Sequence, residues 1–284
     1  MAVLMKGNAL AKKIRAQIQE EVAKRPVPPG LAVIIVGNDP ASRIYVDRKK
    51  EDCVSCGIRS EEFALPETVT TEELVALIQG LNTRGDIHGI LCQLPLPEHV
   101  DKTKVIQSIS PEKDVDGFHF ENMGKIVLGE AGLLPCTPLG VVRLLEAYDI
   151  EIEGKNVVIV NNSNIVGKPL SMLMTNKYAT VTMCHHHTQN LSNHTRHADI
   201  LITAVGIKNL ITSEMVKEGV VVVDIGITRN EAGKVCGDVD FEGVEPKASY
   251  ITPVPGGVGP MTRAMLMENT LTATSCFSPQ FSIQ

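Results

Sequence analysis

The chain has 284 residues, of which 43% are hydrophobic and 21% are charged, and this balance excludes a disordered or fibrous protein. Its length predicts two domains, because single hydrophobic cores stop growing beyond about 250 to 300 residues. The formal net charge of −6 argues against a nucleic-acid-binding protein, since phosphate backbones are met by clustered Lys and Arg.

The N-terminal residues predict a helix of the folded body. The basic residues there would also suit an organelle presequence. However, Leu10, Ile14, Ile18 and Val22 recur every fourth residue, which is typical of an amphipathic helix. No apolar run approaches the roughly 20 residues that cross a bilayer, so we expect no membrane association.

Short apolar runs rich in β-branched residues alternate with helical patterns along the rest of the chain. Such runs are typical of parallel strands buried on both faces, and they lie at 31–37, 88–94, 156–161, 179–184, 199–206 and 219–226. The helical patterns lie at 40–56, 71–82, 138–148, 165–176 and 212–217. The alternation predicts an α/β fold of two α/β domains with a cleft between them.

A segment rich in Gly and Pro with little periodicity, residues 110–140, indicates the boundary between the domains. We expect a first domain over residues 1–120, joined by the C-terminal helix at about 260–284. The second domain, residues 121–259, has the strand, turn and helix order of a Rossmann-type dinucleotide-binding domain.

The seven cysteines indicate a reducing compartment. Their number is odd and they are scattered, which suits free thiols in the cytoplasm better than a disulfide framework. The pair Cys53 and Cys56 lies inside a helical pattern with no second pair, so we expect neither a redox nor a zinc role for it.

Three stretches of the first domain carry candidate chemical groups. Ser42, Tyr45 and Lys49 are spaced by three and four residues and share a helix face, which is an ordinary solvated face unless it lines a cleft. A partly desolvated lysine can exchange protons near neutral pH. Gln93 ends a predicted strand, and Asp114 and Asp116 lie in a loop with a glycine, where a carboxylate can accept hydrogen bonds from a heterocycle or simply form a turn.

Two stretches of the second half are candidates for ligand binding. The loop from Thr252 to Thr262 has three Gly and three Pro before the last helix, so a ligand can approach its backbone closely. Five histidines lie between His185 and His197. Consecutive histidines after a strand alternate sides, so we expect no metal there and instead a cluster that faces a phosphate.

The stretch from Val157 to Leu170, VVIVNNSNIVGKPL, begins like a buried strand that enters a phosphate-binding turn. Most of the glycines of such a turn are missing, so the stretch by itself is also compatible with a plain strand and loop.

These segments together resemble the bifunctional methylenetetrahydrofolate dehydrogenase and methenyltetrahydrofolate cyclohydrolase family. The similarity runs from about Lys6 to Leu271, and it is carried by four ordered motifs, SRIYVDRKKEDCVSCGI, LCQLPLP, KDVDGFH and ITPVPGGVGPMT. The resemblance implies oxidation of 5,10-methylenetetrahydrofolate followed by hydrolysis to 10-formyltetrahydrofolate. It also implies a role in one-carbon metabolism and purine biosynthesis, and a homodimer formed through the Rossmann domain.

The resemblance also assigns roles to residues of the first domain. Lys49 is implied to be the central catalytic residue, Gln93 to hold it, Tyr45 to pack on the folate, and Asp116 to bond the pterin ring. Further substrate contacts are implied for Leu94, Pro255, Gly256, Gly257 and Val258.

The stretch from Val157 aligns with the family's cofactor turn, which commonly begins Gly-Arg-Ser or Gly-Ala-Ser. Ser163, Val166 and Gly167 match it, whereas Asn161 and Asn162 replace the first two residues. Asparagine tolerates the left-handed conformation, so we expect the tight turn to survive. The implied cofactor contacts are Asn161, Asn162, Ser163, Val166, Gly167, His186, Ile227 and Thr252.

NADP is the cofactor that the resemblance implies, and NAD stays possible because the turn lacks an arginine for the 2′-phosphate. His186 occupies a second position for that phosphate. A monofunctional or NAD-dependent dehydrogenase and a noncatalytic nucleotide-binding regulator are the alternative interpretations. The regulator would not need the set Tyr45, Lys49, Gln93 and Asp116.

Overall fold

The computed structural model describes residues 2–229 and 231–277. The chain forms two compact units, each an α/β structure. Unit 1 comprises Met1–Ala11 and Thr137–Thr262, and unit 2 comprises Lys12–Cys136 and Arg263–Gln284. The predicted α/β class with parallel sheets is confirmed.

Unit 2 is built on a three-stranded parallel sheet with the order β3-β2-β4. Its strands are β2 (Gly30–Val36), β3 (Arg59–Leu65) and β4 (Gly89–Cys92). Its helices are α2 (Pro40–Cys56), α3 (Thr71–Thr83), α4 (Lys102–Ser108) and α5 (Phe120–Leu128). Helices α1 (Gly7–Ala23) and α10 (Val258–Ala273) belong to it in part, and a short 3-10 turn, Thr274–Phe277, follows α10.

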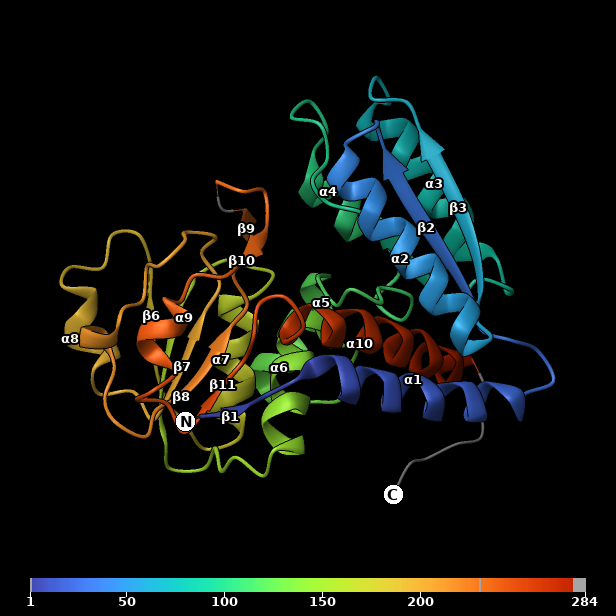
Figure 1. The fold of residues 1–284 in the computed structure, drawn as a ribbon. Coiled ribbons are helices and arrows are strands. Elements are labelled where there is room, and N and C mark those ends of the chain that lie inside the picture. Colours follow the sequence, from blue (N-terminus) through green and yellow to red (C-terminus); the bar gives the residue numbers. More distant parts are fainter. Residues whose placement is uncertain (1, 230, 278–284) are drawn as a thin grey trace. The chain divides into compact units, whose positions relative to one another are not determined.

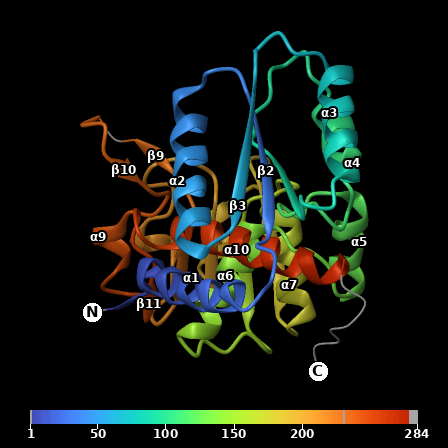
Figure 2. The same cartoon turned by 90° about the vertical axis from the view of Figure 1, so that its right-hand side faces the viewer.

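The sheet of unit 2 is covered on both faces. Alternate residues of β2, among them Ala32 and Ile34, form a buried cluster with side chains of α3 and α4 such as Leu74 and Val105. Figure 2 shows α2 on the other side of β2 and β3. Because both faces are covered, every residue of β2 is buried, which explains why the run from 31 to 37 is apolar without alternation.

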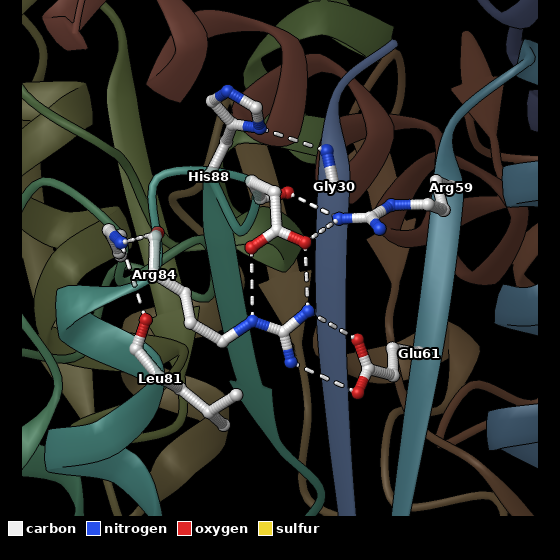
Figure 3. A network of polar contacts seen from close by, with 8 residues as sticks. Gly30, Arg59, Glu61, Leu81, Arg84 and His88 are labelled. Atoms are coloured by element: carbon white, nitrogen blue, oxygen red, sulfur yellow. Dashed lines mark hydrogen bonds and ion pairs between the residues drawn. The ribbon is translucent and has the colours of Figure 1, made fainter.

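A network of charged groups joins the amino ends of the strands of unit 2 (Figure 3). The Arg84 guanidinium bonds to both carboxylate oxygens of Glu61 on β3, at 3.0 and 2.8 Å, and to both of Asp86, at 3.0 and 2.8 Å. The buried Lys113 ammonium donates to the carbonyls of Asn82 and Arg84 at the end of α3. These contacts lie at the edge of the sheet away from the end of β4.

Unit 1 is built on a six-stranded parallel sheet with the order β1-β11-β8-β7-β5-β6 (Figure 1). The strands are β1 (Val3–Leu4), β5 (Asn156–Val160), β6 (Thr180–Cys184), β7 (Ile200–Thr203), β8 (Val221–Asp224) and β11 (Tyr250–Ile251). The helices are α6 (Cys136–Ala147), α7 (Gly167–Asn176), α8 (Leu191–Thr195) and α9 (Phe241–Val244). A small antiparallel ribbon pairs β9 (Thr228–Arg229) with β10 (Val235–Cys236).

The order of strands places a topological switch point in unit 1. Strand β5 has β6 on one side and β7 on the other, so the connections after β5 leave in opposite directions. In such sheets, ligands bind in the crevice at the carboxyl ends of the strands at the switch point. The loops after β5 and β7 are therefore the candidates for the walls of a ligand crevice.

Several elements differ from the sequence prediction. A helix was predicted at 212–217, but the structure has only a short 3-10 turn there, Ser213–Met215. The predicted boundary segment at 110–140 contains α5, a helix of only nine residues flanked by Gly- and Pro-rich stretches. Strand β3 and helix α4 were not predicted.

Among the described residues, no helix has the length and apolar character needed to cross a membrane.

The capping box of α3 generates a stability prediction. The Thr70 hydroxyl accepts from the Glu73 N–H at 3.2 Å, and the Glu73 carboxylate accepts from the Thr70 N–H at 2.8 Å. We expect Thr70→Ala to lower the free energy of unfolding by about 1 kcal/mol, because the N–H of Glu73 loses its acceptor. Urea denaturation measures this. Thr83→Ala, at the other end of the same helix, is the matched control, and an equal loss in both variants would contradict the prediction.

Candidate active site

The side chain of Lys49 lies on the packed face of α2. The residues on this face are spaced alternately by four and three positions. Lys49 is half-buried, and the others are buried, namely Ser42, Val46, Cys53 and Cys56. Tyr45 lies one turn earlier and is 39% exposed. The helix is fixed at its start by Asp39, whose side chain accepts from the Ser42 N–H at 2.8 Å.

A buried ion cluster fixes the middle of α2. Asp52, three residues after Lys49, is 5% exposed. Its carboxylate bonds to Arg263 of α10 at 2.6 Å and to Arg15 of α1 at 3.3 Å. Burial raises the pKa of Asp52, and the two guanidinium groups oppose that rise. The cluster limits rotation of α2, and so it determines where Lys49 points.

Gln93 follows β4 and holds the Lys49 ammonium. The Lys49 Nζ donates to the Gln93 Oε1 at 2.9 Å, and the Gln93 Nε2 donates to the Leu94 carbonyl at 2.6 Å. The backbone N–H of Gln93 donates to the Ile34 carbonyl of β2 at 2.9 Å. The backbone is therefore fixed to β2, and the side-chain amide, held through its Nε2, presents its oxygen to Lys49. Leu94 itself is half-buried.

The two aspartates of the loop after α4 have different surroundings. Asp114 is 1% exposed, and its carboxylate accepts from the His119 N–H at 2.7 Å, the Asn122 side chain at 3.0 Å and the Gly117 N–H at 3.2 Å. Burial raises the pKa of Asp114 to about 6. These bonds shape the loop and hold the Asp114 carboxylate in the protein interior.

Asp116, in contrast, lies near enough to Lys49 for the two charges to interact. Burial raises the pKa of Asp116, and the nearby Lys49 ammonium and the Cys136 thiol oppose that rise. Lys49, Gln93 and Asp116 therefore come together in unit 2 from α2, the end of β4 and the following loop, where a base, an amide and a carboxylate converge.

Cys136 is a neighbour of this group that the sequence did not reveal. It is 3% exposed, and its thiol donates to the Val115 carbonyl oxygen at 3.3 Å. The Asn269 amide of α10 donates to the Cys136 sulfur at 3.7 Å and to the Val115 carbonyl at 2.8 Å. No local pattern marks this cysteine, because its position depends on contacts across more than 100 residues.

The turn between β5 and α7 is organised by the side chain of Asn161. Its Oδ1 accepts from the Ser163 N–H at 2.8 Å, the Ser163 hydroxyl at 2.7 Å and the Gly167 N–H at 3.0 Å. Its Nδ2 donates to the Ala204 carbonyl, in the loop after β7, at 2.6 Å. One amide thus closes the turn and joins it to the loop across the switch point.

The expected tight turn is present, but neither Asn161 nor Asn162 forms it through a left-handed backbone. The residues other than glycine with positive φ in the described chain are Asp149, Tyr178, Asn190 and Asn209. The side chain of Asn161 supplies the turn's hydrogen bonds, so no unusual backbone angle is needed. Gly167 is required for a different reason, because a Cβ there would lie 2.1 Å from the Asn161 carbonyl oxygen.

The other residues predicted to bind the cofactor lie on unit 1. Asn162 is exposed and Val166 precedes α7 as its N-cap residue. Ile227 is 52% exposed after β8. Thr252 is buried after β11, where its hydroxyl accepts from the Asp224 N–H at 2.8 Å. The loop with Pro255, Gly256, Gly257 and Val258 leads into α10, and the Gly256 carbonyl accepts from the Asn8 N–H at 3.1 Å.

His186 lies in a turn directly after β6. The expectation that the three consecutive histidines diverge is wrong, because β6 ends at Cys184 and strand alternation no longer applies. The rings of His186 and His187 are 3.9 Å apart, and each lies 6.1 Å from the His185 ring. In the described part of the chain, no three His, Cys, Asp or Glu side chains are arranged to hold a metal ion.

This chain matches two family models. The catalytic domain of tetrahydrofolate dehydrogenase/cyclohydrolase matches residues 5–116, and the NAD(P)-binding domain of the same family matches residues 135–277. The chain belongs to this family. The predicted family, and with it an enzyme with dehydrogenase and cyclohydrolase activities, is confirmed.

Relatives of this dehydrogenase/cyclohydrolase match nearly its whole length. The bifunctional protein FolD of Nautilia profundicola is 51% identical over 98% of this chain and 99% of its own. The crystal structure of the bifunctional enzyme FolD from Campylobacter jejuni is 52% identical, with a TM-score of 0.96 over 98% of this chain and 100% of that one. The FolD structure from Trypanosoma brucei, complexed with NADP and an inhibitor, is 38% identical, with a TM-score of 0.94 over 98% and 99% of the two chains.

The raised pKa of Asp114 generates a prediction for the pH dependence of stability. Its folded pKa of about 6 lies above the value of about 3.9 in the unfolded chain, so the folded state binds more protons between these values. The contribution of Asp114 to stability therefore rises as the pH falls, by about 1 kcal/mol between pH 7 and 5. We expect Asp114→Asn to lack this rise in urea denaturation. The same pH slope in both proteins would refute the assignment.

Proposed function

We propose that the chain oxidises 5,10-methylenetetrahydrofolate to 5,10-methenyltetrahydrofolate with NADP and hydrolyses this product to 10-formyltetrahydrofolate. The observation that carries the proposal is the position of the Lys49 ammonium, 2.9 Å from the Gln93 oxygen and beside Asp116, in a member of this family. We infer catalytic roles for these three residues, which this arrangement supports.

The surroundings of the nucleotide crevice fit NADP. The turn that starts α7 needs a glycine at Gly167, because a Cβ there would lie 2.1 Å from the Asn161 carbonyl oxygen. NAD-binding domains have an acidic residue at the end of the strand that follows the first helix, and this residue binds the ribose hydroxyls. In this chain that strand is β6, and it is followed by His185, His186 and His187. A histidine can donate to a phosphate, whereas a carboxylate would repel it.

The proposed oxidation depends on how unit 2 receives the positive charge that develops on the folate. NADP, when bound, supplies the acceptor for the hydride that leaves the methylene carbon. The carbon and its two nitrogens then share a positive charge, which the Asp116 carboxylate offsets while it bonds to the pterin ring. Tyr45 provides a flat surface on the same helix, one turn from Lys49.

The proposed hydrolysis uses Lys49 as a proton shuttle. The cationic methenyl carbon disfavours a second positive charge beside it, which favours release of a proton from the Lys49 ammonium. The neutral amine accepts a proton from the attacking water, and a C–O bond forms. Lys49 then gives that proton to N5 as the C–N5 bond breaks, and the remaining proton of the water passes to solvent. Gln93 holds the amine in line throughout.

The domains expected from the sequence are part of this proposal. Residues 1–120 with the helix from about 260 onward would form the folate-binding domain, and residues 121–259 would bind the cofactor through the residues from Asn161 to Thr252. The Pro255–Val258 loop and Leu94 would contact the folate.

We also propose a homodimer formed through the Rossmann domain, a cytoplasmic location and a role in one-carbon supply to purine biosynthesis. The six buried or half-buried free cysteines among the described residues support a reducing compartment.

The role of Lys49 is tested by Lys49→Ala. We expect at least a 100-fold loss of methenyltetrahydrofolate hydrolysis with unchanged thermal unfolding, because the variant lacks the proton shuttle while the Asp52 cluster still holds α2. Loss of absorbance of the methenyl compound measures the reaction.

Lys50→Ala is the matched control for this variant. Lys50 is the next residue on α2 and bonds to Glu62 at 2.8 Å, so we expect its removal to leave hydrolysis within twofold. Hydrolysis by Lys49→Ala at the parent rate would overturn the proposed mechanism.

The role of His186 is tested by His186→Arg. A permanent charge at this position should raise the ratio of the NADP to NAD specificity constants about tenfold, which corresponds to about 1.4 kcal/mol and is within the range of one charged hydrogen bond. Steady-state kinetics with both cofactors measures the ratio.

His194→Arg adds the same charge to an exposed residue of α8 and is the control for a general charge effect. An unchanged ratio in His186→Arg, or an equal rise in both variants, would rule out His186 as the residue that distinguishes the phosphate.

A further inference from the structure

Asp238 is a buried carboxylate in unit 1 with an unusual set of partners. It follows β10, and its exposed fraction is 0%. Its Oδ2 accepts from the Thr203 hydroxyl at 2.8 Å and the Val205 N–H at 2.6 Å. Its Oδ1 accepts from the Gly206 N–H at 2.7 Å and the Ile207 N–H at 2.9 Å. Three of its four donors are therefore consecutive backbone groups.

These three N–H groups form a small anion-binding concavity in the loop after β7. Gly206 has a φ of +81°, a left-handed conformation that turns successive N–H groups toward one point. Such concavities often bind phosphate, but here the chain's own carboxylate fills it. The loop conformation is thus matched to the negative charge of Asp238.

The same loop faces the nucleotide crevice. It leaves β7, the strand next to β5 at the switch point, and its Ala204 carbonyl accepts from the Asn161 amide of the cofactor turn. Val205 and Ile207 are 41% and 53% exposed. The loop is therefore held from the protein side by Asp238 and from the crevice side by Asn161, with two apolar side chains left open to solvent.

A second aspartate holds the neighbouring loop in the same manner. Asp224, at the end of β8, is 4% exposed and accepts from the N–H groups of Gly226 and Val239, both at 2.9 Å. A Cβ at Gly226 would lie 2.2 Å from the Asp238 carboxyl carbon. The loop that carries Ile227 thus packs directly on Asp238, which leaves no room for the carboxylate to move.

We propose that Asp238 is a positioning residue for the dehydrogenase reaction, which holds the Val205–Ile207 loop in the conformation that binds the nicotinamide nucleotide. It contacts neither substrate nor the reacting atoms. The inference rests on the proposed function, in which hydrolysis uses Lys49, Gln93 and Asp116 of unit 2 and needs no nucleotide. Loss of Asp238 should therefore impair one activity and spare the other.

The test is Asp238→Asn, a replacement of equal size that removes the charge and turns an amino group toward the N–H donors of the loop. We expect the KM for NADP in the oxidation of methylenetetrahydrofolate to rise at least tenfold. The KM for the folate and the rate of methenyltetrahydrofolate hydrolysis should stay within twofold of the parent. A role in overall folding alone would lower both activities together.

Asp199→Asn is the matched control. Asp199 accepts from the Asn156 N–H at 2.8 Å and bonds to Lys217 at 2.5 Å, at the amino ends of the same strands. We expect its loss to leave the KM for NADP within twofold. If Asp238→Asn does not fold, the test uses Thr203→Val, which removes one of the four donors and keeps the carboxylate. We expect this variant to raise the KM for NADP about threefold and to leave hydrolysis unchanged.

An unchanged KM for NADP in the folded Asp238→Asn variant, or in Thr203→Val where the former does not fold, overturns the inference. A parallel fall of both activities also overturns it. The proposed function fails separately, and only if the parent protein neither oxidises methylenetetrahydrofolate with NADP nor hydrolyses the methenyl compound.

Discussion

Parallel pairing of buried strands is the constraint on which the site depends. All strands of a parallel sheet end at the same edge, and helices must cover both faces to complete the crossovers. Apolar side chains therefore fill the strands, as in β2 and β5, and polar groups collect where the strands end. Gln93 after β4, Asn161 after β5 and Asp224 at the end of β8 occupy such positions.

Buried carboxylates shape the loops at these edges. Asp114 and Asp238 each accept several hydrogen bonds from neighbouring backbone N–H groups, which offsets the cost of removing a carboxylate from water. Each thereby fixes a loop that carries other residues toward a ligand. Asp116 is different, because the groups that lower its pKa are the Lys49 ammonium and the Cys136 thiol. In the proposed function, the polar edge of the folate completes its surroundings.

Much of the fold was predictable because the pattern of apolar residues along the chain follows which side chains are buried. The six runs of apolar residues correspond to β2, β4, β5, β6, β7 and β8, and the predicted helices at 40–56, 71–82 and 165–176 correspond to α2, α3 and α7. Strand β3 was missed because its residues Glu61 and Glu62 face charged partners, Arg84 and Arg43, in place of a core. Its polar sequence lacks the signal on which the prediction depended.

The residues of the site were predictable only in part. Lys49, Gln93 and Asp116 carry recognisable side chains in ordered motifs, and the fold brings them together in unit 2. Cys136 and Asp238 were missed, because what distinguishes them is a set of contacts with residues 20 to 35 or more positions away. The sequence also suggested the wrong way for Asn161 to form its turn. Asparagine is common in turns both because it tolerates a left-handed backbone and because its side chain can bond to the backbone, and the sequence does not distinguish these two causes.

In this chain, the residue that closes the turn after β5 is different from the residue at which the loop can carry charge. In this chain a side-chain amide holds the turn, and the next residue, Asn162, is exposed and takes no part in the bonds that the amide makes. Residue 162 is therefore a position at which charge can be introduced at the carboxyl end of β5 without rebuilding the turn. For protein engineering, the charge of this loop and its architecture become independent variables.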